Sequence, residues 1–203
     1  MLRRQNMSRI TVTKTKLQDV LIVEQPFFGD IRGFFTESYS KKKFEEAGII
    51  NDFIQDNHSF NKKKWTLRGM HFQKSVAGQA KLVRVITGSV LDVVIDIRKN
   101  SPTYGQWEAH LLSAENKKQL YIPRGFAHGY LTLEDNTNFV YKCDGYYNFS
   151  EEAGTTFDDP DLNIDWGVDL SKVIASEKDL KQPTLAEYDK ENDYEYTSED
   201  DNV

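Results

Sequence analysis

Short hydrophobic segments alternate with polar, turn-forming stretches along most of the chain. The segments are rich in β-branched and aromatic residues, and glycine, asparagine, aspartate or proline bounds them, which is typical of antiparallel strands. They are VLIVE (20–24), GFFTESY (33–39), DFIQDNHSF (52–60), KLVRVITG (81–88), VLDVVIDIR (90–98), QWEAHLLS (106–113), QLYIP (119–123), HGYLTL (128–133) and NFVYKC (138–143). Many short strands separated by turns predict an all-β sandwich or barrel with a few short helices.

One segment has the signals of a helix. In SKKKFEEAG (40–48), Ser40 is a candidate N-cap, Gly48 is a stop, and Phe44 and Ala47 lie three positions apart. This pattern predicts one short helix over residues 41–47.

The segment LRGMHFQ (67–73) does not follow simple alternation. In a regular strand, Arg68 and His71 would point to opposite faces because they are three positions apart. Gly69 lies between them, and glycine is the residue that most readily forms a β-bulge, which adds one residue and shifts the alternation. The sequence therefore predicts a bulge at Gly69 that turns Arg68 and His71 toward one cavity.

The strand KLVRVITG carries a lysine into an apolar setting. By period two, Lys81, Val83 and Val85 share one face, and Leu82, Arg84 and Ile86 share the other. A lysine on a central strand costs stability unless it is paired or faces a cavity. Lys81 is thus a candidate for binding an anion or an enolate, although a lysine that reaches the rim of the barrel would fit the same pattern.

Other polar residues lie within strand-like segments. His128 follows Pro123 and Gly125 near the start of a strand, and Tyr141 alternates with Phe139. On their own, His128 could be a hydrogen-bonded histidine beneath a loop, and Tyr141 could be a core side chain with a solvated hydroxyl. Further polar side chains in such segments are Arg32, Glu37, Gln55 and Asn57. Arginine suits bidentate recognition of phosphate, so a diphosphate ligand becomes plausible.

A metal site is the alternative for the histidines. Two histidines on neighbouring strands of a small barrel are good ligands for zinc, iron or nickel. A metal site of the cupin type usually needs a His-x-His pair, and here Gln73 stands two positions after His71. We therefore expect no metal at these histidines.

Length and charge suggest one domain with a tail. The chain has 203 residues and 38% hydrophobic content, enough for one substantial core. The net charge of −6 comes largely from residues 187–203, where eight acids face one lysine. We expect a domain over residues 1–186 and an acidic, disordered tail over 187–203. The remainder is close to neutral, which does not predict a nucleic-acid partner.

Compartment signals are few. The single cysteine, Cys143, cannot form a disulfide within the chain. The N-terminal sequence MLRRQNMSRI is followed by polar residues, without an apolar run that predicts a signal peptide or a membrane span. The sequence predicts a cytoplasmic protein without a membrane partner.

Taken together and in order, several motifs resemble those of the dTDP-4-dehydrorhamnose 3,5-epimerases. The resemblance covers roughly residues 13–186, and the motifs together are specific, whereas each alone would be weak. They are FGDIRGFFTESY, FIQDNHS, LRGMHFQ, QAKLVRV, SPTYGQW, IPRGFAHGYLTL, FVYKC and SEKD.

The resemblance implies a cupin-like double-stranded β-helix, or jelly roll, that forms a homodimer and needs no cofactor. It implies a dTDP-4-keto-6-deoxy sugar as substrate, with inversion at C3 and C5 through an enolate. His71 is similar to the family's general base, Asp179 to its dyad partner, Tyr141 to the general acid and Lys81 to the group that stabilises the enolate. The implied substrate-binding residues are Arg32, Glu37, Gln55, Asn57, Arg68, His128, Glu152 and Lys178, with Glu151 as an alternative to Glu152.

Two other functions fit parts of the same pattern. A relative that inverts only one carbon, or a sugar-nucleotide ketoisomerase of similar fold, would use the same kind of base chemistry. A cupin that binds sugar nucleotides without turnover would not need the Tyr141 hydroxyl. Product analysis separates the enzymatic alternatives, and turnover excludes the last one.

Overall fold

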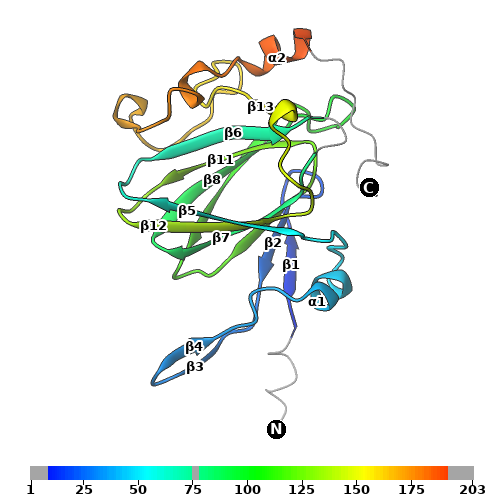
Figure 1. Cartoon of the computed structure of the whole chain (residues 1–203), viewed down its shortest axis with the longest axis vertical. Helices are drawn as coiled ribbons and strands as arrows, with labels where there is room; N and C mark the ends of the chain where they lie inside the picture. Colours follow the sequence, from blue (N-terminus) through cyan, green and yellow to red (C-terminus); the bar gives the residue numbers. More distant parts are fainter. Residues whose placement is uncertain (1–8, 75–77, 192–203) are drawn as a thin grey trace.

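The computed structural model describes residues 9–74 and 78–191, and most of its strands lie in two antiparallel sheets (Figure 1). One sheet has the order β1-β2-β10-β7-β12-β5. Its strands are β1 (Thr11–Lys14), β2 (Leu21–Glu24), β5 (Gln55–Asn61), β7 (Lys81–Thr87), β10 (Gln119–Ile122) and β12 (Thr137–Cys143). The other has the order β13-β6-β11-β8-β9. Its strands are β6 (Leu67–Gln73), β8 (Ser89–Asp96), β9 (Trp107–Ser113), β11 (Phe126–Thr132) and β13 (Glu152–Gly154).

The main core lies between these two sheets. Val83 and Val85 of β7 pack with Val90 and Val94 of β8, and Phe139 of β12 is fully buried in the same cluster. The face of β7 that carries Val83 and Val85 is therefore the inner face, as alternation predicts. The expected all-β jelly roll with a few short helices is confirmed, and it directs the side chain of Lys81 inward.

The predicted short helix is present as α1 (Lys41–Glu46). Ser40 occupies the N-cap position with extended backbone, but its side chain makes no capping hydrogen bond. Phe44 anchors the helix, because it is only 1% exposed and packs in a cluster with Val23 and Leu82 on the outer side of the six-stranded sheet. Short 3-10 helices follow at η2 (Phe149–Glu151), η3 (Leu170–Lys172) and η4 (Asp179–Lys181).

A second helix, α2 (Leu185–Glu191), corrects the predicted start of the tail. Leu185 is buried, and the ring of Tyr188 packs edge-on against Phe72 with centroids 5.0 Å apart. This contact belongs to the apolar cluster on the outer face of β6, which the C-terminal segments cover (Figure 1). Residues 187–191 are thus helical, because an apolar contact offsets the entropy of ordering them. Residues 192–203 of the predicted tail lie outside the described residues.

The β3–β4 hairpin departs from the two sheets. Strands β3 (Phe28–Asp30) and β4 (Gly33–Phe35) pair only with each other and project away from the body (Figure 1). The expected strand over 33–39 therefore ends early. Phe34 and Phe35 are 60% and 70% exposed, an unusual environment for two large apolar side chains.

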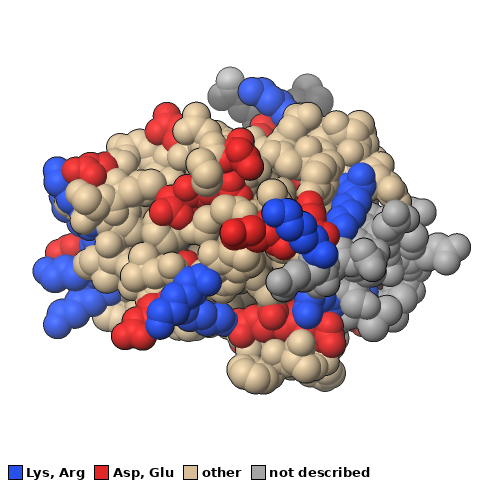
Figure 2. All heavy atoms as spheres, turned by 90° about the horizontal axis from the view of Figure 1, so that it is seen from above, with Lys and Arg blue, Asp and Glu red and all other residues tan. Residues whose placement is uncertain are grey.

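The charge distribution agrees with the near-neutral balance of the chain outside its acidic end. Figure 2 shows acidic and basic side chains intermixed over one face of the molecule. Such a face lacks the continuous basic stripe typical of nucleic-acid binding. Among the described residues, no helix is long and apolar enough to cross a membrane.

Candidate active site

The irregular segment LRGMHFQ forms β6, and its glycine is where the ladder shifts. His71 pairs with His128 of β11, but Arg68 pairs with Tyr130, so the register changes between these two positions. Gly69 has φ +140°, and a Cβ there would lie 2.5 Å from the Cα of Gly129. Only glycine fits this close approach. The predicted bulge is confirmed, and both Arg68 and His71 line one cavity.

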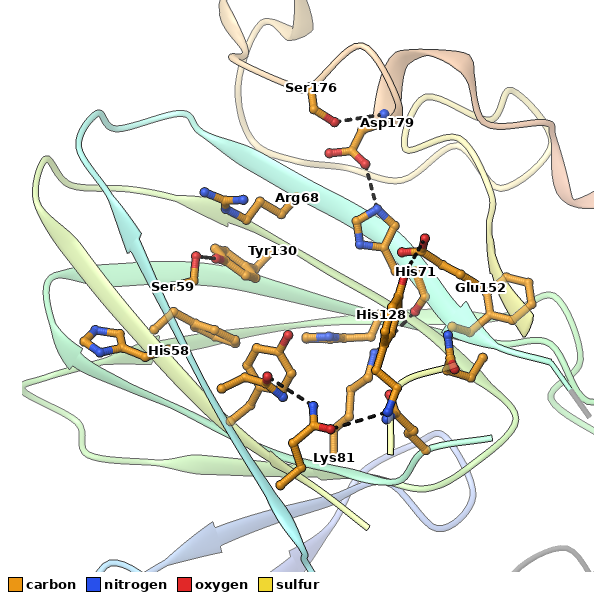
Figure 3. Close-up of a pocket in the computed structure, with 18 of the residues that line it drawn as sticks. His58, Ser59, Arg68, His71, Lys81, His128, Tyr130, Glu152, Ser176 and Asp179 are labelled. Atoms are coloured by element: carbon orange, nitrogen blue, oxygen red, sulfur yellow. Dashed lines mark hydrogen bonds and ion pairs between the residues drawn. The ribbon is translucent and has the colours of Figure 1, made fainter. Parts of the chain in front are cut away.

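That cavity has a volume of about 720 Å³, and residues of both sheets line it (Figure 3). It brings together most of the candidate residues, including both proposed proton-transfer groups. The candidates that line it are Gln55, Asn57, Arg68, His71, Lys81, His128, Tyr141, Glu152, Lys178 and Asp179. Glu151, the alternative to Glu152, is not among the lining residues.

His71 and Asp179 form a dyad across 108 positions of sequence. The Nε2 atom of His71 lies 2.6 Å from Oδ1 of Asp179, at the start of η4. Ser176 holds the backbone of Asp179, because its hydroxyl oxygen accepts the Asp179 N–H at 3.1 Å. Burial opposes ionisation, but the hydrogen bond from His71 holds the pKa of Asp179 below its usual value. A carboxylate on Nε2 leaves Nδ1 as the basic atom of His71.

Tyr141 and Lys81 reach the same cavity from the opposite sheet. Tyr141 lies on β12 and Lys81 on β7, whereas His71 lies on β6. Burial raises the pKa of Tyr141 to about 12, so its hydroxyl is protonated at neutral pH. Burial lowers the pKa of Lys81, and its Nζ donates only a long bond of 3.4 Å to the carbonyl of His71. The cavity thus has an imidazole on one wall and a phenol on the other.

A buried hydrogen-bond network holds Arg68. Its Nε donates to Oδ1 of Asn61 at 2.9 Å, and Asn61 also donates to the hydroxyl of Tyr130 at 3.3 Å. The Tyr130 hydroxyl donates to Ser59 at 2.9 Å. Within the described ranges, neither Nη atom of Arg68 has a hydrogen-bond partner in the protein, so the outer edge of the guanidinium is available to the cavity that Arg68 lines.

Polar side chains surround the cavity mouth. Glu152 forms an ion pair with Lys178 through Oε1, and its Oε2 accepts a hydrogen bond from the Tyr147 hydroxyl at 2.9 Å. Burial opposes ionisation, but the bond from Lys178 lowers the pKa of Glu152. On the opposite side, Gln55 donates to Asn57 at 3.1 Å. These groups offer both donors and acceptors to the polar end of a ligand.

Arg32 and Glu37 do not reach the cavity of their own chain. Arg32 lies in the hairpin turn with its side chain 85% exposed, and its Nε donates to Asp30 at 3.0 Å. Glu37 pairs instead with Lys43 of α1 at 2.8 Å. Their predicted role is therefore not explained by the site within one chain.

Several residues that line or support the cavity are not among those predicted from the sequence. Ser59 continues the alternation of Gln55 and Asn57, and Tyr130 follows His128 by two positions, so period two could have identified both. Asp92 lies between the apolar residues Leu91 and Val93 of β8, a signal of a buried polar contact. Tyr147 and Ser176 lie in loops and have no comparable signal.

The described residues contain no group of three or more histidine, cysteine, aspartate or glutamate side chains placed to hold a metal ion. His71 and His128 each bond a carboxylate through Nε2. The chemistry of this donor set is therefore that of two separate histidine–carboxylate pairs.

Known proteins resemble this chain over most of its length. The family model described as dTDP-4-dehydrorhamnose 3,5-epimerase matches residues 14–187. The dTDP-4-dehydrorhamnose 3,5-epimerase of Salmonella typhimurium is 50% identical over 175 residues, 86% of this chain and 94% of that protein.

Solved structures agree in fold as well as in sequence. A dTDP-6-deoxy-D-glucose-3,5-epimerase from Legionella pneumophila, in complex with dTDP-4-keto-L-rhamnose, is 42% identical with a TM-score of 0.88, and the match covers 94% of this chain and all of that one (100%). A 3'-monoepimerase from Streptomyces bikiniensis, in complex with dTDP-quinovose, is 32% identical with a TM-score of 0.79 over 84% of this chain and 86% of that one. With the family model covering nearly the whole described chain, the protein belongs to the dTDP-4-dehydrorhamnose 3,5-epimerase family of isomerases.

Proposed function

We propose that the protein inverts C3 and C5 of dTDP-4-dehydro-6-deoxy-D-glucose and gives dTDP-4-dehydro-L-rhamnose, a step of dTDP-L-rhamnose biosynthesis. The observation that carries the proposal is the placement of His71 and Tyr141 on opposite walls of one cavity. Inversion of a carbon requires removal of a proton from one face and delivery to the other. Two groups on opposite walls supply this geometry.

Each inversion begins with proton abstraction next to the ketone. Nδ1 of His71 takes the proton from C3 or C5. The electron pair of that C–H bond forms a double bond to C4, and the π pair of the C4 carbonyl moves to its oxygen, which gives the enolate. Protonated Lys81 stabilises the charge on this oxygen. Asp179 stabilises the imidazolium that forms, because it accepts the Nε2–H at 2.6 Å.

Tyr141 completes the inversion from the other wall. Its hydroxyl proton passes to the same carbon on the opposite face, the C4 ketone re-forms, and solvent later restores both protonation states. A phenol with a pKa of about 12 holds its proton until it meets a carbanionic carbon. The outer edge of Arg68 and the polar groups at the mouth would hold the substrate, so that binding far from the reacting carbons positions the ring.

The measurement that tests this function is product analysis. The purified protein is given dTDP-4-keto-6-deoxyglucose, and a 4-reductase with NADPH traps the product, whose configuration NMR reads at C3 and C5. Inversion at both carbons supports the proposal. Inversion at one carbon would instead assign the chain to the single-carbon activity, and absence of turnover would favour a binding protein.

The proposed chemistry requires no cofactor, because side chains of the protein supply the base, the acid and the cation that stabilises the enolate. We expect turnover to be unchanged, within about twofold, after exhaustive dialysis against EDTA, because every proton-transfer step uses a side chain. The coupled assay measures this directly. Turnover that EDTA removes and a divalent metal restores would contradict this expectation.

Arg32 and Glu37 would act in a homodimer, in which the exposed hairpin of one chain completes the cavity of its partner. The exposure of Phe34 and Phe35 supports this arrangement, because two large apolar side chains at 60% and 70% exposure favour burial against a second surface. A symmetric dimer would exchange both hairpins at once. We also propose a cytoplasmic location, for which the free, buried thiol of Cys143 is suited.

The hairpin proposal predicts complementation between variants. The Arg32→Ala substitution should weaken the site of the partner chain, whereas His71→Asn should disable the site of the chain that carries it. In a mixed dimer both substitutions fall in the same site, so the other site is intact. Co-refolding equal amounts should then restore about one quarter of wild-type sites, by random pairing. The assay uses substrate below the wild-type KM. His71→Asn mixed with Lys81→Ala, which share one cavity, is the matched control and should show no rescue. Equal absence of rescue in both mixtures would contradict the exchange.

A further inference from the structure

A second histidine–carboxylate pair lies beneath the cavity, and the proposed proton transfers do not use it. Nε2 of His128 is 3.0 Å from each carboxylate oxygen of Asp92. The Asp92 side chain is fully buried at 0% exposure, and that of His128 is 8% exposed. The imidazole is stacked near the ring of Phe139, with centroids 6.2 Å apart.

Strand register fixes this pair rigidly. His128 of β11 is directly opposite Val94 of β8, and Asp92 stands two positions before Val94 on the same strand. Diagonal neighbours on one face of an antiparallel pair lie within reach of long side chains. Both members are thus held by a central ladder and not by a loop, in contrast to Asp179 of the first dyad.

The bond to Asp92 decides the tautomer of His128. A carboxylate can only accept a hydrogen bond, so the Nε2 atom must carry a proton. In a neutral imidazole the other nitrogen, Nδ1, is then an acceptor. Burial lowers the pKa of His128 more than Asp92 raises it, which favours the neutral ring at neutral pH.

The Nδ1 atom is open to the cavity. Within the described ranges, Nδ1 of His128 has no hydrogen-bond partner. Among these residues, the only fully buried side-chain nitrogen or oxygen without a partner is Nε2 of His110, so Nδ1 of His128 is not fully buried. Because His128 lines the cavity, its free nitrogen contacts the cavity space. The neighbouring basic groups, Arg68 and Lys81, offer only donors, so the acceptor of His128 is of a different kind.

We propose that Asp92 is a positioning residue that locks His128 with Nδ1 toward the ligand, as an acceptor for one ring hydroxyl of the sugar. The inference rests on the proposed function and deepens it, because it assigns recognition of a hydroxyl group to this pair. Donors would hold the ketone and the diphosphate, and the His128–Asp92 pair would select a sugar that carries a hydroxyl next to it. A site built to bond a hydroxyl rejects an analogue that lacks it.

The test compares substrate analogues that lack the 2-hydroxyl or the 3-hydroxyl. The rate of C5–H exchange with deuterated solvent is measured, since loss of the 3-hydroxyl changes the acidity at C3. We expect the wild type to disfavour one analogue by about 10²-fold or more. In Asp92→Asn the preference should fall to about 10-fold, because an amide can donate to Nε2 as well as accept from it.

A double variant guards against a simple folding defect. Asp92→Leu with His128→Phe removes both buried polar partners, which costs less than leaving one unpaired. The double variant should react with both analogues at about the same rate. Its affinity for dTDP should stay within about threefold of the wild-type value, because dTDP carries no hexose. A structural role alone would lower all rates and leave the preference as it is.

The tautomer is measured without turnover, by ¹⁵N NMR of the free protein. The inference requires a protonated Nε2 and an unprotonated Nδ1 at His128 in the wild type, and a mixture in Asp92→Asn. A wild-type His128 ring protonated at Nδ1 would overturn the inference. An equal preference between the analogues in the wild type, Asp92→Asn and the double variant would also overturn it, as would a wild type without any preference. Failure of the proposed function would look different, because the wild type would then show no exchange at C3 or C5 of the parent substrate.

Discussion

Replacing His71 with asparagine is expected to abolish both epimerisation and exchange of the C3 and C5 hydrogens with deuterated solvent. Without the imidazole of His71, the group that takes the proton in the proposed step is missing, and no enolate forms. The expected loss is on the order of 10²- to 10⁴-fold for one acid–base group. Proton NMR in deuterated buffer follows the exchange and the product together.

His110→Asn is the matched control for this substitution. His110 lies on β9 outside the cavity and pairs only weakly with Glu108, at 3.8 Å. The control should keep wild-type exchange and turnover. If His71→Asn exchanged either hydrogen at the rate of the control, His71 would not be the base.

Tyr141→Phe is expected to separate proton removal from inversion. The base and Lys81 remain, so the enolate still forms and a solvent proton can return from the same face. Exchange should therefore persist, whereas inverted product should fall by about 10²- to 10⁴-fold. The quantity to measure is the ratio of exchange to epimerisation, which should rise well above the wild-type value.

Tyr130→Phe tests whether this effect is specific to one hydroxyl. Tyr130 lines the same cavity, but its hydroxyl already donates to Ser59 at 2.9 Å. Its removal should leave the ratio of exchange to epimerisation at the wild-type value, whatever its effect on binding. A ratio that stays unchanged in Tyr141→Phe, or that rises equally in both variants, would contradict the assignment of acid and base to opposite walls.

The local sequence pattern was sufficient to predict most strands and the bulge at Gly69. Alternation identified the inner face of β7, because burial of one face imposes a period of two on any paired strand. The bulge was predictable since Gly69 is the one residue in LRGMHFQ that tolerates the backbone required. These are short-range constraints, and neighbouring residues alone carry them.

The local sequence pattern could not predict segments that have few apolar residues, or contacts that depend on tertiary packing. Residues 187–191 of α2 were assigned to the acidic tail because their composition is polar, whereas the burial of Leu185 and the packing of Tyr188 on Phe72 depend on the tertiary structure. Asp92 was not identified as a site residue from the sequence, because its partner His128 stands 36 positions away. The hairpin position of Arg32 could not be read from spacing either.

The sequence by itself determined the strand pattern, the bulge and, through its ordered motifs, the family. The tertiary structure alone decided which polar groups meet, since His71 bonds Asp179 from 108 positions away and Tyr141 faces them from the other sheet. The physical reason is the range of each constraint. Alternation and glycine conformation act within a few residues, whereas the pairing of buried polar groups depends on how two separate sheets pack.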